Sequence, residues 1–456
     1  MAGIGFELRR LLRDQSFLGL LRGYGYAGLI TSGPWVFSIV GVLLIGILSV
    51  GQFNPRPEIA LFLVSINYAI AISLIFTGSF QLLFTRYISD RLYEHRDDLV
   101  IPNLAGALTL IGASGGVVSG LILAFFFKES LVYKMLMVGI FVTLCEIWIV
   151  VVLVSGLRVP EKILASFFIG YALSVGGALA LRPFGVNGLL AGFLFGQVVM
   201  LYLMVAVIIH KYPLAKLVQF NFLDRQKIYL SLSATGFLFN AGIWADKFIF
   251  WMNPETSSPV TGLFRSSIIY DLPISIAYLS IIPGMAVFLV RIETDFAEQY
   301  EAFYGAVRDG DTLNHIQKLK ASMTYTIRQG VYEILKVQGM TVLLLLLAGS
   351  AILRFFGLSH LYLQLYQVDL VGVGVQVVML ATFNVFFYLD LRLIALLLSM
   401  LFVSANIALT LLTQSLGPMY YGYGFAVAVS FTSLVGLVIL SRKLRSLETD
   451  TFMMAG

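Results

Sequence analysis

The feature that most constrains this chain is a succession of twelve apolar runs separated by short polar segments. A helix that crosses a bilayer needs about 20 mostly apolar residues, and every run is close to that length. The strands of a membrane β-barrel would instead alternate over ~10-residue segments. The sequence therefore predicts an all-α polytopic membrane protein with twelve transmembrane helices. The predicted spans are 26–50, 59–84, 103–127, 131–155, 162–182, 185–209, 227–253, 265–290, 339–357, 365–389, 391–412 and 419–440.

Composition excludes several other classes of protein. Charged residues make up 12% of the chain and apolar residues 59%, whereas soluble domains carry roughly 25% charged residues. An ordinary soluble enzyme, a disordered protein and a nucleic-acid binder are therefore excluded. The single cysteine, Cys145, excludes a disulfide framework and a cysteine metal cluster. No phosphate-binding loop or metal-ligand spacing is found, so we expect no catalytic residue, no metal and no cofactor.

The distribution of Lys and Arg predicts the orientation in the membrane. If the N-terminus is cytoplasmic, 23 of the 30 Lys and Arg residues fall in cytoplasmic segments and 6 in outer ones, with Lys247 inside a span. Cytoplasmic loops carry the excess of positive charge, so both termini are expected in the cytoplasm. Residues 1–25 read as an amphipathic helix on the membrane surface, and 441–456 as a cytoplasmic tail.

The long polar gap at 210–226 separates six spans from six. This division predicts two six-helix lobes, 26–209 and 227–440, joined by a cytoplasmic linker and arranged around a central cavity. Both lobes would begin on the cytoplasmic side, as in parallel repeats. A single large helical bundle remains the alternative.

A second long polar segment, 291–338, is expected to form a cytoplasmic pair of amphipathic helices. Gly310 breaks the helical pattern, and Asp311 or Thr312 can cap the second helix. One interpretation is a solvated connector. The other is a docking surface for a cytoplasmic partner, and its candidate contact residues are Glu298, Glu301, Phe303 and Tyr304.

Polar residues inside the spans are the candidates for a transport path, because charge in hydrocarbon is costly and usually faces a cavity or a partner. Adjacent helical residues differ in direction by about 100°. We therefore expect Asp246 and Lys247 to point differently, one facing the cavity and one pairing with a neighbour, as in a Lys247–Asp271 or Arg265–Asp246 pair. A structural ion pair near the outer interface is the alternative. The candidate path residues are Asp246, Lys247, Asn240, Arg265, Asp271 and Glu146.

Helix-breaking residues indicate where spans bend. Gly33 and Pro34 lie within the first span, and Pro273, Pro283 and Gly284 within the eighth. Proline removes a backbone donor and kinks a helix, and bent spans beside a cavity can flex between access states.

Two N-terminal stretches carry a family resemblance. Residues 1–12, MAGIGFELRRLL, and 24–35, YGYAGLITSGPW, resemble the start of PelG proteins. The similarity in length and in number of spans extends over the whole chain, including the cytoplasmic segment after the eighth span. No binding residue assigned in that family can be matched to a position here.

The resemblance implies a polysaccharide exporter related to the multidrug/oligosaccharidyl-lipid/polysaccharide (MOP) flippases, with two lobes around a central cavity. It implies export of the Pel exopolysaccharide, an N-acetylhexosamine-rich polymer of biofilm matrix, across the bacterial inner membrane. It also implies a complex with the cytoplasmic glycosyltransferase PelF and the membrane proteins PelD, a cyclic di-GMP receptor, and PelE, in contact with membrane lipids.

Three alternatives to polymer export stay open from the residues alone. A lipid-linked oligosaccharide flippase would share the fold. A cation-coupled small-molecule antiporter of the MATE type would need a titratable acid in its cavity, for which Asp246 or Glu146 could serve. A scaffold without transport activity is the third. None of these readings makes the protein an enzyme.

Overall fold

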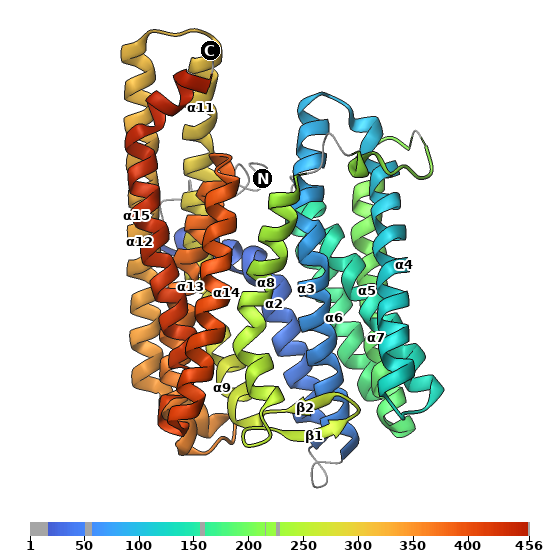
Figure 1. Ribbon diagram of the computed structural model, residues 1–456. Helices are drawn as coiled ribbons and strands as arrows, with labels where there is room; N and C mark the ends of the chain where they lie inside the picture. The colour runs from blue at the N-terminus through green and yellow to red at the C-terminus, as the bar shows by residue number, and fades with distance from the viewer. Residues whose placement is uncertain (1–16, 51–56, 156–159, 215, 225–228, 455–456) are drawn as a thin grey trace. The chain divides into compact units, whose positions relative to one another are not determined.

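The computed structural model describes residues 17–50, 57–155, 160–214, 216–224 and 229–454. The first two-thirds of the predicted surface helix at 1–25 lies outside these residues. The chain divides into two compact units, one of residues 33–269 and one of residues 270–456 together with residues up to 32. These are the 33–269 unit and the 270–456 unit (Figure 1).

The 33–269 unit is helical apart from one short hairpin. Its elements are α2 (Phe17–Val50, from Gly33 onward), α3 (Pro57–Tyr93), η1 (Asp97–Leu99), α4 (Val100–Phe126), α5 (Leu131–Ser155), α6 (Pro160–Leu181), η2 (Arg182–Phe184), α7 (Gly185–Ile209), η3 (Asn221–Leu223), α8 (Leu230–Met252), β1 (Ser258–Thr261) and β2 (Phe264–Ser266). The two strands pair antiparallel, with Ser258 opposite Ser266 and an irregularity between Pro259 and Thr261.

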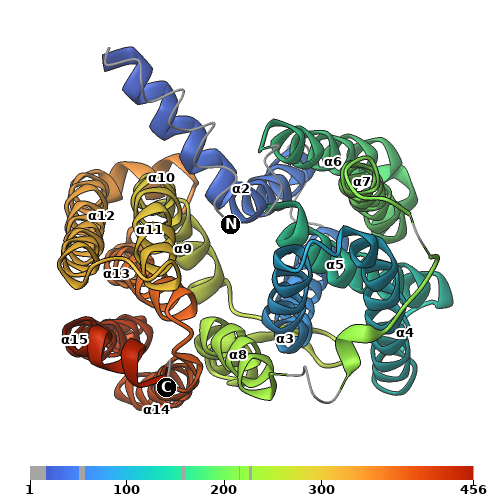
Figure 2. The ribbon, with the colours of Figure 1, turned by 90° about the horizontal axis from the view of Figure 1, so that it is seen from above.

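The 270–456 unit contains the remaining elements. They are α9 (Ile268–Tyr278), α10 (Ile281–Val290), a π-helical turn η4 (Arg291–Phe296), α11 (Ala297–Arg308), α12 (Leu313–Phe355), η5 (His360–Tyr362), α13 (Leu363–Tyr388), α14 (Arg392–Leu416), η6 (Pro418–Tyr420) and α15 (Tyr423–Met454). Seen end-on, α13 lies between α12 and α15 (Figure 2). The predicted cytoplasmic helix after Gly310 and the predicted ninth span are one continuous helix, α12.

Every predicted span overlaps a helix, but the count of twelve crossings stays a prediction. Within the described residues, eight helical segments are long and apolar enough to cross a membrane, or nine if the bent pair formed by Ile268–Tyr278 and Ile281–Arg308 is one span. One of the eight, Glu161–Ile209, contains both α6 and α7.

Glycines allow α6 and α7 to fold back on each other as an antiparallel hairpin. A Cβ on Gly192 would collide with the backbone of Gly177 and Ala178, and one on Gly188 with the carbonyl of Leu181. Such close backbone approach is typical of small residues at membrane helix interfaces. Because the contacts pair earlier residues of α6 with later residues of α7, this segment turns back on itself.

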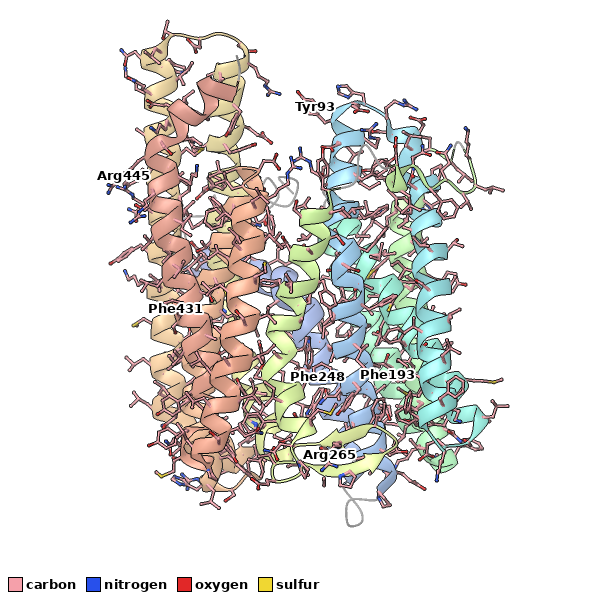
Figure 3. The ribbon with its side chains drawn as sticks, viewed as in Figure 1. Tyr93, Phe193, Phe248, Arg265, Phe431 and Arg445 are labelled. Atoms are coloured by element: carbon pink, nitrogen blue, oxygen red, sulfur yellow. The ribbon has the colours of Figure 1, made fainter. Side chains whose placement is uncertain are left out.

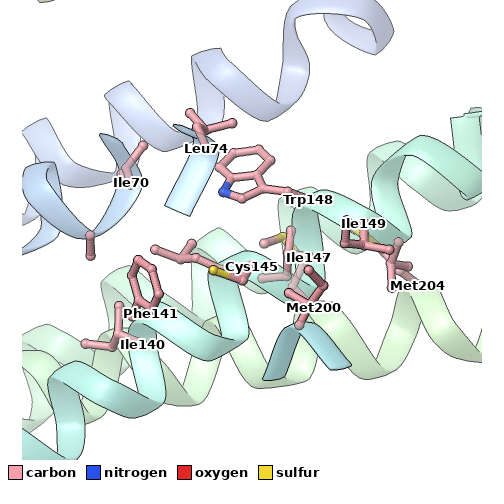
Figure 4. Packing of buried hydrophobic residues seen from close by; sticks show 14 of the residues in the cluster. Ile70, Leu74, Ile140, Phe141, Cys145, Ile147, Trp148, Ile149, Met200 and Met204 are labelled. Carbon is pink, nitrogen blue, oxygen red and sulfur yellow. The ribbon is translucent and has the colours of Figure 1, made fainter. Parts of the chain in front are cut away.

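The core of the 33–269 unit lies among α3, α5 and α7. Ile70 and Leu74 of α3 approach Phe141 and Trp148 of α5, with Met200 of α7 nearby (Figure 4). The indole Nε1 of Trp148 donates to Ser73 Oγ at 3.0 Å, and Ser73 Oγ donates in turn to the carbonyl of Ile70. The one polar atom of the tryptophan is thereby satisfied inside an apolar interface.

Part of the predicted inter-lobe linker packs onto the 33–269 unit. Phe222 of η3 is fully buried and meets the rings of Phe80, Phe84 and Tyr87 edge-on at 5.2–6.3 Å. The backbone N–H of Asn221 donates to Asn103 Oδ1 at 2.9 Å. These contacts anchor this stretch of the linker to the helices that precede it.

Helix α8 follows that linker and belongs to the same compact unit, because it packs antiparallel along α3. A Cβ on Gly236 would collide with the carbonyl of Gly78, so the two backbones touch. Near the other end, the rings of Tyr68 and Trp251 stack at 4.4 Å. The boundary of this unit therefore falls after residue 269, whereas the sequence places a lobe boundary at 210–226.

Candidate functional site

Helix α8 carries a buried ion pair formed by two adjacent residues. Lys247 Nζ lies 3.0 Å from Asp246 Oδ2 and 3.2 Å from Asp246 Oδ1, and it donates to the carbonyl of Ile243 at 3.0 Å. Asp246 has no exposed surface and Lys247 is 5% exposed. A buried charge is tolerated when it is paired and hydrogen-bonded, and each of these groups meets that condition.

The expectation that adjacent helical positions keep the two charges apart is wrong for this pair. The 100° between their directions concerns the Cα–Cβ bonds, and the four-carbon stem of Lys247 is long enough to bring its ammonium group back to Asp246. The Trp244 ring centroid lies 5.9 Å from the same ammonium group. The positive charge therefore sits among a carboxylate, a carbonyl and an indole face of its own helix.

Arg265 fastens the β1–β2 hairpin to the end of α8, and within the described residues the suggested Arg265–Asp246 pair is not formed. Its Nε donates to Ser257 Oγ at 2.8 Å and to the Trp251 carbonyl at 3.1 Å, and its Nη2 donates to the Ser257 carbonyl at 3.1 Å. Its backbone N–H donates to Tyr68 Oη at 3.3 Å. Figure 3 shows Arg265 at the β1–β2 hairpin.

Asn240 lies one and a half turns before the ion pair, beside the glycine contact between α3 and α8. Its Nδ2 donates to the Gly236 carbonyl at 2.9 Å, and a Cβ on Gly78 would lie 2.6 Å from the same nitrogen. The amide is half-buried. The structure thus brings Asn240, Asp246 and Lys247 together on one helix that is packed against α3.

Two further predicted path residues lie on other helices. Glu146 of α5 is half-buried and faces α4, where a Cβ on Gly112 would lie 2.8 Å from its Oε1. Asp271 is half-buried in the first turn of α9, in the other compact unit. Glu146 therefore faces α4 and is not part of the cluster on α8.

The predicted bend in the eighth span lies at a side chain inserted into the helix. Gly284 N–H donates to Gln338 Oε1 at 3.1 Å, and Gln338 Nε2 donates to the Ser280 carbonyl at 3.0 Å. In an unbroken helix, Gly284 N–H would bond the Ser280 carbonyl directly. The Gln338 carboxamide from α12 bridges these two groups in place of that bond. Pro283 has no N–H and cannot form the preceding backbone bond of the helix. The helical segments Ile268–Tyr278 and Ile281–Arg308 are bent here by 40°.

The other two predicted kinks leave the helix assignment unbroken. Pro273 is buried inside α9 and the helix continues to Tyr278. Helix α2 is likewise continuous across Gly33 and Pro34, although the division between the compact units falls between Ser32 and Gly33.

A polar node follows α10 in the 270–456 unit. Arg291 forms a bidentate pair with Glu333, at 2.6 and 2.9 Å, and a further bond of 2.8 Å to Asp295. These bonds tie the π-helical turn η4 to α12. π-Helical turns inside helices occur frequently at functional sites.

Glu293, in the same turn, is buried and ties η4 to α13. Its Oε1 accepts from Asn384 Nδ2 at 2.6 Å and its Oε2 from the Tyr388 hydroxyl at 3.4 Å. The rings of Phe296 and Tyr300 pack against Tyr388 at 5.3 and 5.5 Å. The segment after the eighth span is therefore held rigidly against two other helices.

The predicted helical pair after this node is present, and its capping residue is Thr312. The backbone turns at Gly310 with φ +68°, and Thr312 Oγ1 accepts from the N–H of His315. Among the four candidate docking residues, Glu298 and Glu301 are exposed and Tyr304 is half-buried, whereas Phe303 has no exposed surface. A docking contact in this segment would therefore rest on the two glutamates.

Sequence reasoning missed the residues that hold the bend and the node. Gln338 and Glu293 both lie at the edge of a long polar segment, where polar residues are expected and do not indicate a site. The one signal in the sequence is that each residue lies within one or two helical turns of an apolar run. In the described part of the chain, no three His, Cys, Asp or Glu side chains are grouped so as to hold a metal ion.

The comparison with protein families gives one match. Residues 1–452 match the family described as "PelG: Putative exopolysaccharide Exporter (EPS-E)". The match covers almost the whole chain and includes both compact units. No match was found among curated proteins.

Solved structures of similar fold are transporters. An outward-facing multidrug resistance MATE family transporter of the MOP superfamily has a TM-score of 0.62 at 14% identity, covering 93% of this chain and 97% of its own. An inward-facing one has a TM-score of 0.63 at 11% identity, covering 92% and 96%. A MOP superfamily transporter from Pyrococcus furiosus has 0.62 at 14%, covering 93% and 97%. At these identities the likeness establishes the fold alone.

Proposed function

Because the chain belongs to the PelG family of exopolysaccharide exporters, we propose that it exports the Pel exopolysaccharide, an N-acetylhexosamine-rich polymer, across the bacterial inner membrane for biofilm matrix. The observation that carries the proposal is the family match over residues 1–452, on a chain with a MOP-superfamily transporter fold. A cytoplasmic glycosyltransferase of the PelF type supplies the polymer, and membrane proteins of the PelD and PelE type complete the complex.

The proposed path runs beside α8. Asn240, Asp246 and Lys247 supply an amide, a carboxylate and an ammonium group on one helix, and all three can hydrogen-bond sugar hydroxyl or acetamido groups. Glu146, Arg265 and Asp271 are the further polar residues proposed for the path. The scarcity of buried charge suits a largely uncharged polymer, because neutral sugars are recognised by hydrogen bonds and not by dense charge.

Orientation is part of the proposal. With both termini cytoplasmic, the polar node around Arg291 and the helical pair α11–α12 face the synthase. The excess of Lys and Arg in the segments on that side supports this topology.

Inside-out vesicles provide the test. Vesicles containing the purified complex receive an activated N-acetylhexosamine nucleotide, and polymer that resists an added glycosidase is measured. We expect protected polymer only when this protein is present together with the synthase. Equal protection without it, or protection of short lipid-linked oligosaccharides in place of polymer, would contradict polymer export.

A second candidate, a cation-coupled small-molecule antiporter, is favoured by the MATE fold and by the half-buried acid Glu146 within a spanning helix. Proton-driven dye uptake into vesicles separates it from polymer export. Dye uptake that is abolished by Glu146→Gln and is the same with and without the synthase would establish the antiporter.

A further inference from the structure

A groove in the 270–456 unit lies between α12 and α15. It has a volume of about 450 Å³ and is found where the apolar part of each helix gives way to a polar part. One stripe of α12 and one short stripe of α15 line it. The lining residues are Gln317, Lys320, Ala321, Thr324, Tyr325, Arg328, Leu444, Arg445 and Glu448.

The charges in the groove leave two arginines available to a ligand. Lys320 bridges the helices, with Nζ 3.2 Å from Glu448 Oε1 and 3.1 Å from the Arg445 carbonyl, so its charge is already compensated. Arg328 and Arg445 are exposed, and within the described residues neither guanidinium group has a carboxylate partner. The groove therefore presents two uncompensated planar cations, the side chains best suited to phosphate.

The faces that bear these arginines continue as exposed apolar stripes. On α15, Val438, Leu434 and Phe431 follow Arg445 at intervals of three to seven residues, and each is 47–62% exposed. Figure 3 labels Arg445 and Phe431 at successive levels of this helix. At a rise of 1.5 Å per residue they lie about 21 Å apart, which is most of the depth of a hydrocarbon layer.

The same order of residues occurs on α12. Arg328 lies between two exposed tyrosines, Tyr325 and Tyr332, and exposed Leu335 and Leu343 follow along the helix. Tyrosines concentrate at the boundary between headgroups and hydrocarbon. On both helices, an exposed arginine thus lies at the depth of the lipid phosphates and the apolar side chains lie at the depth of the acyl chains.

We propose that this groove is a binding site for an anionic phospholipid, with its phosphate held by Arg328 and Arg445 and its acyl chains lying along the exposed stripes of α12 and α15. Basic pockets between transmembrane helices on the cytoplasmic side bind such headgroups. Because one lipid contacts both helices, its binding also joins α15 to α12, adding to the link that the side chain of Lys320 forms at this level.

The test measures lipid retention on the purified full-length protein. Native mass spectrometry counts the phosphatidylglycerol and cardiolipin molecules that stay bound, and Arg328→Gln and Arg445→Gln are made singly and together. Removing each guanidinium group is expected to weaken retention about fivefold, and the double variant more than either single one. Arg328→Lys with Arg445→Lys, which keeps the charge but not the fork, is expected to retain an intermediate amount.

A matched control exists on the same two helices. Lys318→Gln with Arg442→Gln removes two exposed cations that do not line the groove, and it is expected to leave retention unchanged. If the control loses as much bound lipid as the Arg328 and Arg445 variants, the effect is one of general surface charge and the proposed site is refuted. Binding of inorganic phosphate or a soluble glycerophosphate as tight as that of the lipid would overturn the lipid assignment, and retention of phosphatidylcholine equal to that of phosphatidylglycerol would do the same. Size-exclusion profiles and melting temperatures without added lipid verify that each variant folds.

Discussion

At the scale of single residues, the ion pair of α8 is expected to contribute to stability and is also part of the proposed path. Asp246 and Lys247 lie 3.0 Å apart, and both side chains are buried. Breaking a buried pair from one side leaves an uncompensated charge, which costs much more than removing both charges together. This asymmetry allows the structural role and the transport role to be measured separately.

Asp246→Asn is expected to destabilise the protein by about 3 kcal/mol, because the ammonium group of Lys247 keeps its charge and loses the carboxylate that lies 3.0 Å away. Asp246→Asn combined with Lys247→Gln removes both charges and is expected to recover most of the folded protein. The folded amount is measured by fluorescence-detected size exclusion, and secreted polymer is normalised to it. If the pair lines the path, secretion per folded molecule stays low in the double variant. Normal secretion from it would restrict the pair to a structural role.

At the scale of elements, two helix contacts determine which spans belong together and where one of them bends. The α3–α8 contact depends on the absence of a side chain at Gly236 and Gly78, and the α9–α10 bend depends on the carboxamide of Gln338. In both cases a residue on one helix determines the course of another. Each contact yields a prediction for a single substitution.

Gly236→Val is expected to force α8 away from α3, because its Cβ would collide with the Gly78 carbonyl. Overpacking of this kind costs roughly 1–3 kcal/mol. The measurement is the melting temperature of the detergent-solubilised protein. Gly120→Val is the matched control, because nothing lies within 4 Å of a Cβ at that membrane-helix glycine. Equal destabilisation by both substitutions would refute a tight α3–α8 contact.

Gln338→Leu is expected to leave the Gly284 N–H and the Ser280 carbonyl without their bridge, at a cost of about 1–3 kcal/mol. The helix can recover part of this cost by closing its own bond, and the 40° bend should then decrease. Distances between spin labels on α9 and α10 report the angle. Gln329→Leu on the same helix, where the amide bonds only the exposed Tyr325 hydroxyl at 2.8 Å, serves as the control. An unchanged angle together with unchanged stability would remove Gln338 as the cause of the bend.

At the scale of the whole molecule, the bonds of η4 present α11 and the start of α12 as one rigid surface. Arg291 and Glu293 attach this segment to α12 and α13, and Glu298 and Glu301 remain exposed on it. A rigid, charged surface suits a permanent partner better than a mobile connector would, because no ordering is needed upon binding.

Reversing the charge of both glutamates, Glu298→Lys with Glu301→Lys, is expected to reduce recovery of the proposed glycosyltransferase partner in co-purification. Two exposed ion pairs contribute up to about 1 kcal/mol together, which corresponds to roughly fivefold weaker binding. Asp309→Lys with Asp311→Lys, in the adjacent turn, changes charge equally and serves as the comparison. Full recovery of the complex from the glutamate variant would exclude docking through this face.

Much of this architecture follows from the sequence because it depends on local properties. Apolar runs of bilayer length define helices wherever they occur, since an unpaired backbone group cannot remain in lipid. The turn at Gly310 and the cap at Thr312 are equally local, and so is the weakness that Pro283 introduces into the eighth span. The N-terminal resemblance to PelG is confirmed by the match over residues 1–452.

Pairing between distant segments was decided by the tertiary structure alone. Nothing in the sequence says that Gly236 meets Gly78, that Gln338 enters the bond between Gly284 and Ser280, or that Arg328 and Arg445 share one groove. Even for the adjacent Asp246 and Lys247 the expected separation is wrong, because a helical projection gives the direction of Cβ and not the reach of a lysine. The sequence by itself determined which segments are helical and that the chain is a membrane protein, since those follow from length and hydropathy. The tertiary structure decided which polar groups find one another, since this depends on contacts between residues far apart in the chain.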